Sequence, residues 1–121
     1  MGKNLKTHKK LSYMHNNKIE WLDVKKKDSD VYVEIQLTPT QTIEPSDIPQ
    51  AVDYVFKKVN ELNGGKRVRI TGRGPIWLYA AIVHTVAHLC ECVQVFDAVQ
   101  RRWITVVTHS NICKLGEIEY A

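Results

Sequence analysis

The chain has 121 residues, of which 44% are apolar and 25% are charged, a composition typical of one globular domain and far from that of a disordered protein. The longest apolar run, Ile76 to Val83, is too short to cross a bilayer, and no signal-peptide pattern is present, so we expect a cytoplasmic protein without a membrane span. The formal net charge is +4, and this total is misleading until the charges are mapped along the chain.

The positive charge is concentrated at the start of the chain. Residues 1–18 carry five lysines and no acid, whereas the remaining residues have 12 basic and 13 acidic side chains. This distribution predicts a basic, flexible tail over residues 1–18 and a single α/β domain over residues 19–121. A solvated tail is the ordinary interpretation, and steering toward nucleic acid is the alternative.

The cysteine pattern does not predict a disulfide or zinc scaffold. Cys90, Cys92 and Cys113 are odd in number and contain no C-x-x-C pair, which argues against a disulfide framework and against a structural zinc site. We therefore expect buried thiols.

The first half of the chain predicts a hairpin followed by a helix. Ile19–Val24 and Val31–Leu37 alternate with a period near two, and the polar residues 25–30 between them predict a turn. After a connector rich in Pro and Thr, apolar residues recur at helical spacing behind Ser46-Asp47, and Asn63-Gly64-Gly65 predicts the end of that helix.

The second half predicts a strand, a helix and two more strands. Arg67–Thr71 is followed by a Gly-Arg-Gly-Pro turn into a helix over Ile76–Leu89, which is apolar on nearly every side and is therefore expected to be largely buried. Cys92–Phe96 and Trp103–Thr108 predict the last strands. The order ββαβαββ predicts a single-domain α/β fold with a mixed, mostly parallel, Rossmann-like sheet flanked by two helices.

The turn Gly72-Arg73-Gly74 has the features of an anion site. A strand that ends in two glycines and opens a helix combines free backbone N–H groups, the positive end of a helix dipole and a guanidinium that can fork onto phosphate oxygens. A tight turn with an exposed arginine is the alternative, because the glycines of this segment have neither the Walker nor the Rossmann spacing.

Two histidines and an aspartate could carry chemistry. His84 and His88 are four residues apart on the second helix, and Asp97 ends the following strand, at the same sheet edge as Thr71 if the two strands are parallel. Such groups can bind a divalent transition metal or act as acid and base, whereas a hydrogen-bonded core position is the favoured interpretation of His84 alone. His109 ends the last strand, and an antiparallel final strand would place it at the opposite edge.

The stretch from Thr71 to His109 resembles the CRISPR-associated ring nuclease 3 family of type III CRISPR systems. The resemblance is carried by Gly72-Arg73-Gly74-Pro75-Ile76-Trp77-Leu78-Tyr79, by His84, by Val93-Gln94-Val95-Phe96-Asp97 and by Val106-Val107-Thr108-His109 with Ser110. Two departures from the family pattern stand out: no second histidine lies beside His88, and the Pro-Arg that commonly follows the aspartate is replaced by Ala98-Val99.

The resemblance implies a prokaryotic cytoplasmic ring nuclease, a metal-dependent phosphodiesterase that binds cyclic tetra-adenylate and linearises it with Mn²⁺, switching off type III CRISPR signalling in antiviral defence. It implies a homodimer, or a tetramer that sandwiches the ligand. It gives His88 and Asp97 as catalytic residues and metal ligands, and Gly72, Arg73, Gly74, His84 and His109 as ligand-binding residues.

Two other functions remain open from the sequence. A non-catalytic sensor or sponge for the cyclic nucleotide is favoured by the altered histidine pair, and a manganese-dependent exonuclease that deadenylates RNA 3′ ends would be assisted by the basic tail.

Overall fold

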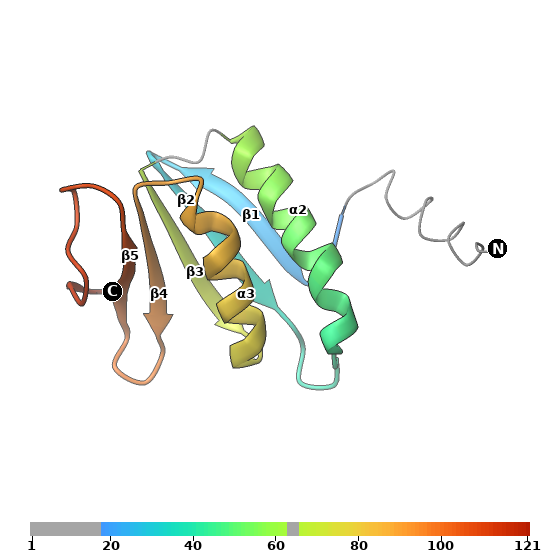
Figure 1. Ribbon diagram of the computed structural model, residues 1–121. Coiled ribbons are helices and arrows are strands. Elements are labelled where there is room, and N and C mark those ends of the chain that lie inside the picture. The colour runs from blue at the N-terminus through green and yellow to red at the C-terminus, as the bar shows by residue number, and fades with distance from the viewer. Residues whose placement is uncertain (1–17, 63–65) are drawn as a thin grey trace.

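The computed structural model describes residues 18–62 and 66–121, which form a sheet covered on one face by two helices (Figure 1). The elements in chain order are β1 (Leu22–Lys27), β2 (Asp30–Gln36), a single 3₁₀ turn η1 (Pro45–Asp47), α2 (Ile48–Glu61), β3 (Arg67–Arg73), α3 (Ile76–Ala87), β4 (Cys92–Asp97), β5 (Arg102–Thr108) and β6 (Ile118–Tyr120). The predicted basic tail, residues 1–18, lies outside the described residues except for Lys18, and so does the predicted helix end at residues 63–65.

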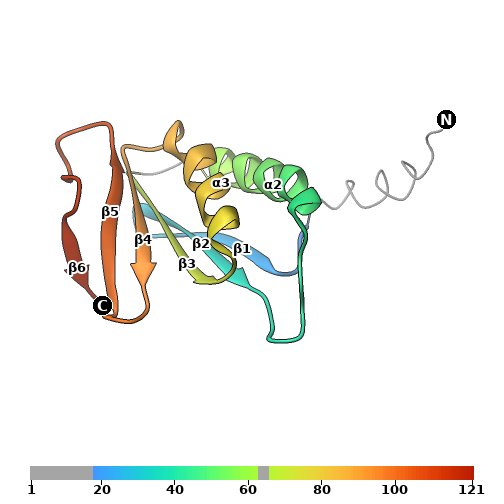
Figure 2. The ribbon, with the colours of Figure 1, turned by 60° about the horizontal axis from the view of Figure 1, so that its bottom comes forward.

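The predicted α/β class and the order ββαβαββ are confirmed for the first seven elements, but the mostly parallel, Rossmann-like sheet is wrong. The six strands lie in sequence order, β1 to β6, and only the pairs β2·β3 and β3·β4 are parallel. The other three pairs are antiparallel because short connections join them. Since β3 and then β4 are each added on the same side of the sheet, two right-handed crossovers put both helices on the same face (Figure 2).

The core lies between this helical layer and the sheet. Its fully buried residues alternate along β2 and β3 and recur at helical spacing along the helices, as side chains that face one layer must. They include Val31, Val33, Ile35, Val55, Val59, Val68, Ile70, Leu78, Ile82 and Val86. The core begins at Ile19, which is 6% exposed. Neither described helix is long and apolar enough to span a bilayer.

Helix α3 is less buried than its sequence predicts. In place of the expected largely buried helix, only Leu78, Ile82 and Val86 of its twelve residues are buried. These three face the sheet, and Ile76 in the first turn is 86% exposed. The reason is architectural: a two-layer fold covers one side of a helix and leaves the opposite side without a protein layer.

The sheet face without helices carries a buried arginine. Arg69, 6% exposed, donates a hydrogen bond from Nε to the side-chain oxygen of Gln94 at 2.7 Å and another from Nη2 to the carboxylate of Glu119 in β6. Its guanidinium lies 5.0 Å from the ring centroid of Trp103 and 6.0 Å from that of Tyr32. Because Gln94 in turn donates to Thr105 at 3.0 Å, the strands β2 to β6 are tied together by one polar network.

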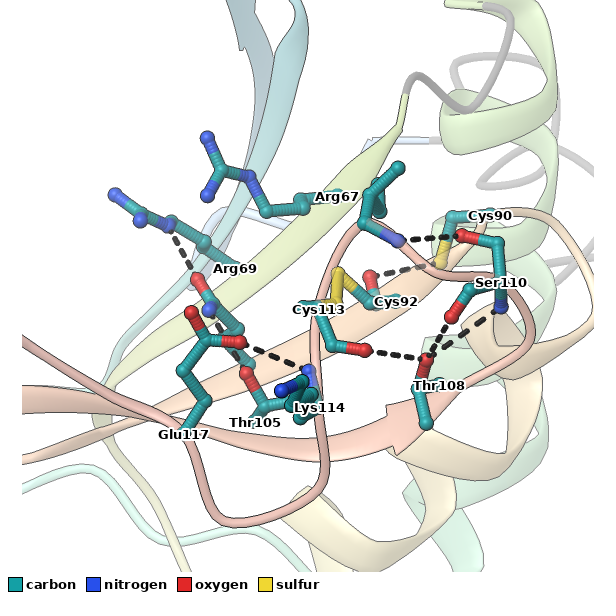
Figure 3. The surroundings of a disulfide bond; sticks show 12 residues. Arg67, Arg69, Cys90, Cys92, Thr105, Thr108, Ser110, Cys113, Lys114 and Glu117 are labelled. Carbon is teal, nitrogen blue, oxygen red and sulfur yellow. Dashed lines mark hydrogen bonds between the residues drawn. A yellow bond between two sulfur atoms is a disulfide. The ribbon is translucent and has the colours of Figure 1, made fainter.

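The expectation of free thiols is wrong for two of the three cysteines. Cys92 at the start of β4 and Cys113 in the loop before β6 form a disulfide that fixes this loop to the sheet (Figure 3). Only Cys90 is free, and burial raises the pKa of its thiol to about 11. Counting cysteines could not reveal the pair, because it depends on a tertiary contact between residues 21 positions apart.

Candidate functional site

The carboxyl ends of β2, β3 and β4 meet at one edge of the sheet, which we call the carboxyl edge. Because β3 and β4 are parallel, Arg73 and Asp97 both end their strands there, as the sequence predicts if these strands are parallel. Helix α3 also begins at this edge, directly after the Gly72-Arg73-Gly74-Pro75 turn. The carboxyl edge is where open α/β sheets ordinarily bind ligands.

The two glycines of the turn let β3 approach β2 closely. Gly72 has φ +104°, and a Cβ built on it would lie 2.1 Å from the carbonyl oxygen of Ile35. A Cβ on Gly74 would lie 3.0 Å from Cγ2 of Ile35 and 3.5 Å from Leu78. The hydroxyl of Tyr79 donates to the Gly72 carbonyl and holds the turn against the first turns of α3. The glycines therefore have a packing role, whatever role they have toward a ligand.

Arg73 and the start of α3 form a cationic corner. Arg73 is exposed, and no described carboxylate lies within ion-pair distance of its guanidinium. No side chain caps α3, whose N-cap is Pro75. The positive end of the helix dipole and a guanidinium without a described ion pair therefore belong to the same turn, an arrangement that favours a phosphate.

A groove of about 320 Å³ lies beside this corner. One wall is the β2–η1 connector and the other is the start of α3; the lining residues are Leu37, Thr38, Pro39, Gln41, Thr42, Ile43, Arg73, Gly74, Pro75 and Trp77. The groove offers an indole and aliphatic side chains for a planar ring, with hydroxyl and amide groups for its polar edge. The sequence predicts this connector but not its place in the site, because residues 37–43 show no periodicity and only the β2·β3 pairing brings them to Arg73.

Asp97 is engaged with its own hairpin. Its carboxylate accepts from Nε of Arg102 at 3.0 Å and from the backbone N–H of Val99 at 3.1 Å. Burial raises the pKa of the Asp97 carboxyl, but the bonds from Arg102, Gln100 and Val99 outweigh that effect, and its pKa lies below the ordinary value. Asp97 is thus ionised at neutral pH and holds Arg102 at the carboxyl edge, near the exposed Arg101.

The histidines of α3 lie away from this edge. His84 and His88 are exposed, their ring centroids are 5.6 Å apart, and both line a groove between α2 and α3 together with Asp53 and Phe56. The expectation of a core position for His84 is wrong, because its side of α3 faces this groove instead of the sheet. His88 ends α3 just before β4 begins, so roughly 17 Å of strand, at about 3.3 Å per residue, separates its end of the sheet from Asp97.

His109 lies at the same end as His88, which we call the amino edge. Strand β5 is antiparallel to β4, and the backbone N–H of His109 donates to the carbonyl of Glu91 at 2.8 Å. Of the predicted site residues, Gly72, Arg73, Gly74 and Asp97 are therefore together at the carboxyl edge, whereas His88 and His109 are at the opposite edge. Among residues 18–62 and 66–121, no group of three His, Cys, Asp or Glu side chains is arranged to hold a metal ion.

Comparison with known proteins identifies a family. A family model described as CRISPR-associated protein (Cas_csx3) matches residues 37–118, which include the connector, both edges and every predicted site residue. Neither the curated proteins nor the solved structures gave a significant match.

Proposed function

The chain belongs to the CRISPR-associated Cas_csx3 family, and from this premise we propose that it binds cyclic tetra-adenylate at the carboxyl edge and opens the ring to linear oligoadenylate. The observation that carries the proposal is the free guanidinium of Arg73 beside the uncapped start of α3. Each phosphate of a cyclic oligonucleotide carries one negative charge, which these groups can neutralise.

The surroundings of Arg73 suit an adenosine nucleotide. The groove beside Arg73 can receive a base against Trp77, while Thr38 and Gln41 provide partners for its ring nitrogens and amino group. Arg101 and Arg102 lie at the same edge, in and after the β4–β5 turn, and can contact a neighbouring phosphate. The carboxyl edge thus combines phosphate and base recognition, which a bare anion site lacks.

One chain offers too few contacts for a ring of four equivalent nucleotides. A cyclic tetranucleotide contains a two-fold axis, and a homodimer with closed two-fold symmetry would present matched Arg73 turns to opposite phosphates. We therefore propose that the ring lies on the two-fold axis of a homodimer. The dimer would then present two copies of the groove and of the arginines to the ring, one from each chain.

Ring opening needs no group from outside the ring as nucleophile. A ribose 2′-oxygen loses its proton to a base and forms a bond to the adjacent phosphorus, and the bond from that phosphorus to the 5′-oxygen breaks as the leaving oxygen takes up a proton. Arg73 or Arg102 would offset the charge that develops on the phosphate oxygens. His88 would serve as the base or acid.

The positions of the histidines require more than one dimer for this chemistry. Because His88 and Asp97 lie at opposite edges of one chain, they cannot share a Mn²⁺ ion within it. In a head-to-tail stack of two dimers, the amino edge of one dimer, with His88 and His109, would face the carboxyl edge of the other. This stack is the tetramer that would sandwich the ring.

A non-catalytic sensor or sponge is the second candidate function. It is favoured by the separation of His88 from Asp97, since binding at the carboxyl edge needs neither histidine. The two functions predict the same affinity site and differ in whether product forms.

Incubation with cyclic tetra-adenylate separates them. Protein at several concentrations is mixed with the ring, with Mn²⁺ or with EDTA, and products are resolved by chromatography. Linear oligoadenylate whose rate rises more steeply than linearly with protein concentration, and which His88→Ala abolishes, is expected for the nuclease. Binding without product supports the sponge, and absence of binding contradicts both. A labelled RNA that ends in adenosines, run in parallel, tests for deadenylation.

A further inference from the structure

The two histidines of α3 are spaced to share one metal ion. His84 and His88 are four residues apart, so their rings project from the same side of the helix, one turn apart. Their ring centroids are 5.6 Å apart. Two imidazoles on one Zn²⁺ ion, with metal–nitrogen bonds of about 2.1 Å in a tetrahedral arrangement, have centroids about 5 Å apart. A small rotation of the side chains is therefore enough to bring both rings onto a common ion.

The histidine pair is open to solvent and has an acidic neighbour. Both rings are exposed and line a groove of about 520 Å³ between α2 and α3, which lie side by side on the sheet (Figure 1). No described carboxylate lies within ion-pair distance of either ring. Asp53 lines the same groove from α2, and its ion pair with Lys57, at 3.1 Å, joins two side chains that are each about half exposed. Because such exposed pairs contribute little to stability, Lys57 does not keep Asp53 from a cation in the groove.

We propose that His84 and His88 bind a Zn²⁺ ion in this groove, with water in the other coordination positions and Asp53 accepting a hydrogen bond from one of these waters. Imidazole nitrogens favour Zn²⁺, Ni²⁺ and Cu²⁺, whereas oxygen ligands suit Mn²⁺. A site with two ring nitrogens should therefore prefer Zn²⁺ to Mn²⁺. Water completes the coordination, so the site does not depend on a third His, Cys, Asp or Glu ligand among the described residues.

This site gives His88 a different partner from the one that the resemblance implies. Asp97 ends β4 at the carboxyl edge, whereas His84 is on the same helix as His88. Since His88 is the C-cap of α3 and the two rings are aligned only in the folded helix, the ion would hold the last turn of α3 and stabilise the folded chain. Because the proposed ring opening uses His88 as base or acid, the ion would also compete with that reaction; this consequence alone rests on the proposed function.

The closing experiment measures metal binding without the ring, so that its outcome is independent of ring binding. Calorimetric titration of the full chain with ZnCl₂, in a buffer that does not chelate metals, should give one ion per chain, and MnCl₂ should bind at least about tenfold more weakly. His84→Ala and His88→Ala should each weaken Zn²⁺ binding by more than about tenfold, and Asp53→Asn, which removes only the charge, should weaken it by less. Thr85→Ala is the matched control: Thr85 lines the same groove, but its hydroxyl donates to the Ala81 carbonyl at 2.9 Å, and this variant should bind as the wild type does.

Two further measurements keep the proposal testable. His8 and His15 lie outside the described residues, and a variant with both replaced by alanine should retain Zn²⁺ binding. In NMR spectra of the wild-type chain, which need no variant to fold, Zn²⁺ should shift the imidazole proton signals of His84 and His88 and leave those of His109 in place. Absence of Zn²⁺ binding, binding retained by both α3 variants, or binding lost with His8 and His15 would overturn the proposal. Zn²⁺ that binds as expected but leaves ring opening unchanged would keep the site and contradict the role proposed for His88.

Discussion

Replacing Gly72 with alanine tests whether the turn is held by close strand packing. A Cβ at φ +104° would lie 2.1 Å from the Ile35 oxygen and 2.6 Å from the Ile35 nitrogen, both backbone atoms that cannot rotate away. The positive φ costs about 1–2 kcal/mol for an alanine. Relief of the overlap requires β2 and β3 to separate by about 1 Å at this end, which sacrifices two ladder hydrogen bonds at about 1 kcal/mol each. We therefore expect a loss of about 3–4 kcal/mol in the free energy of unfolding.

Gly116→Ala is the matched control, because Gly116 also has a positive φ, +83°, but a methyl group added there would have no atom within 4 Å. Its loss should be confined to the conformational cost of about 1–2 kcal/mol. Urea unfolding followed by tryptophan fluorescence, at one fixed protein concentration, gives both values. Equal destabilisation by the two substitutions would refute the argument that Gly72 is required by the approach of β3 to β2.

Three further predictions concern the rest of the molecule. Arg69→Ala should lower the free energy of unfolding by about 2–4 kcal/mol, because it leaves the buried Gln94 oxygen without its donor. Arg67→Ala, which removes a 34% exposed side chain, should lower the free energy of unfolding by less, and urea unfolding measures both values. Cys90 should react with iodoacetamide at pH 8 about a hundredfold more slowly in the folded protein than in the unfolded chain. A pKa of about 11, against an ordinary 9.0, lowers the fraction of thiolate at pH 8 by about that factor. Equal rates of modification, measured by mass spectrometry, would contradict the buried position. Removal of residues 1–16 should leave thermal unfolding and ring cleavage unchanged, because the core begins at Ile19, while a truncated chain that fails to fold would show a structural role for the tail.

The sequence predicts the elements where burial imposes a period. The alternation in Val31–Leu37 and the helical spacing from Val52 to Leu62 arise because one face of β2 and of α2 packs on the core. The predicted turn over residues 25–30 is too long, since β1 continues to Lys27. Lys25–Lys27 lie in an edge strand that projects into solvent, where no apolar residue marks the pairing. β6 was missed because three exposed residues have no burial pattern at all.

In the candidate site, the features set by neighbouring residues can be predicted from the sequence, whereas those set by tertiary packing cannot. The Gly-Arg-Gly-Pro turn is local, and its place between β3 and α3 follows from the sequence alone. The placement of Asp97 at the same edge needed only parallel β3 and β4, which the crossover length indicates. The separation of His88 from Asp97 follows from the length of β4 and the direction of α3. The groove beside Arg73 depends on the β2–η1 connector, whose path no periodicity specifies.

Titration of cyclic tetra-adenylate against Arg73→Ala tests the central claim most directly. Because Arg73 is exposed in the turn and has no ion pair among the described residues, the fold should be retained, and the loss of charge-assisted bonds to phosphate should weaken binding by about 1–3 kcal/mol, or roughly 5- to 150-fold in Kd. Lys25→Ala, which removes an exposed cation in the middle of β1, away from the carboxyl and amino edges, is the control and should bind as the wild type does. Unchanged affinity of Arg73→Ala, or an equal loss in both variants, would contradict the ring site at the carboxyl edge.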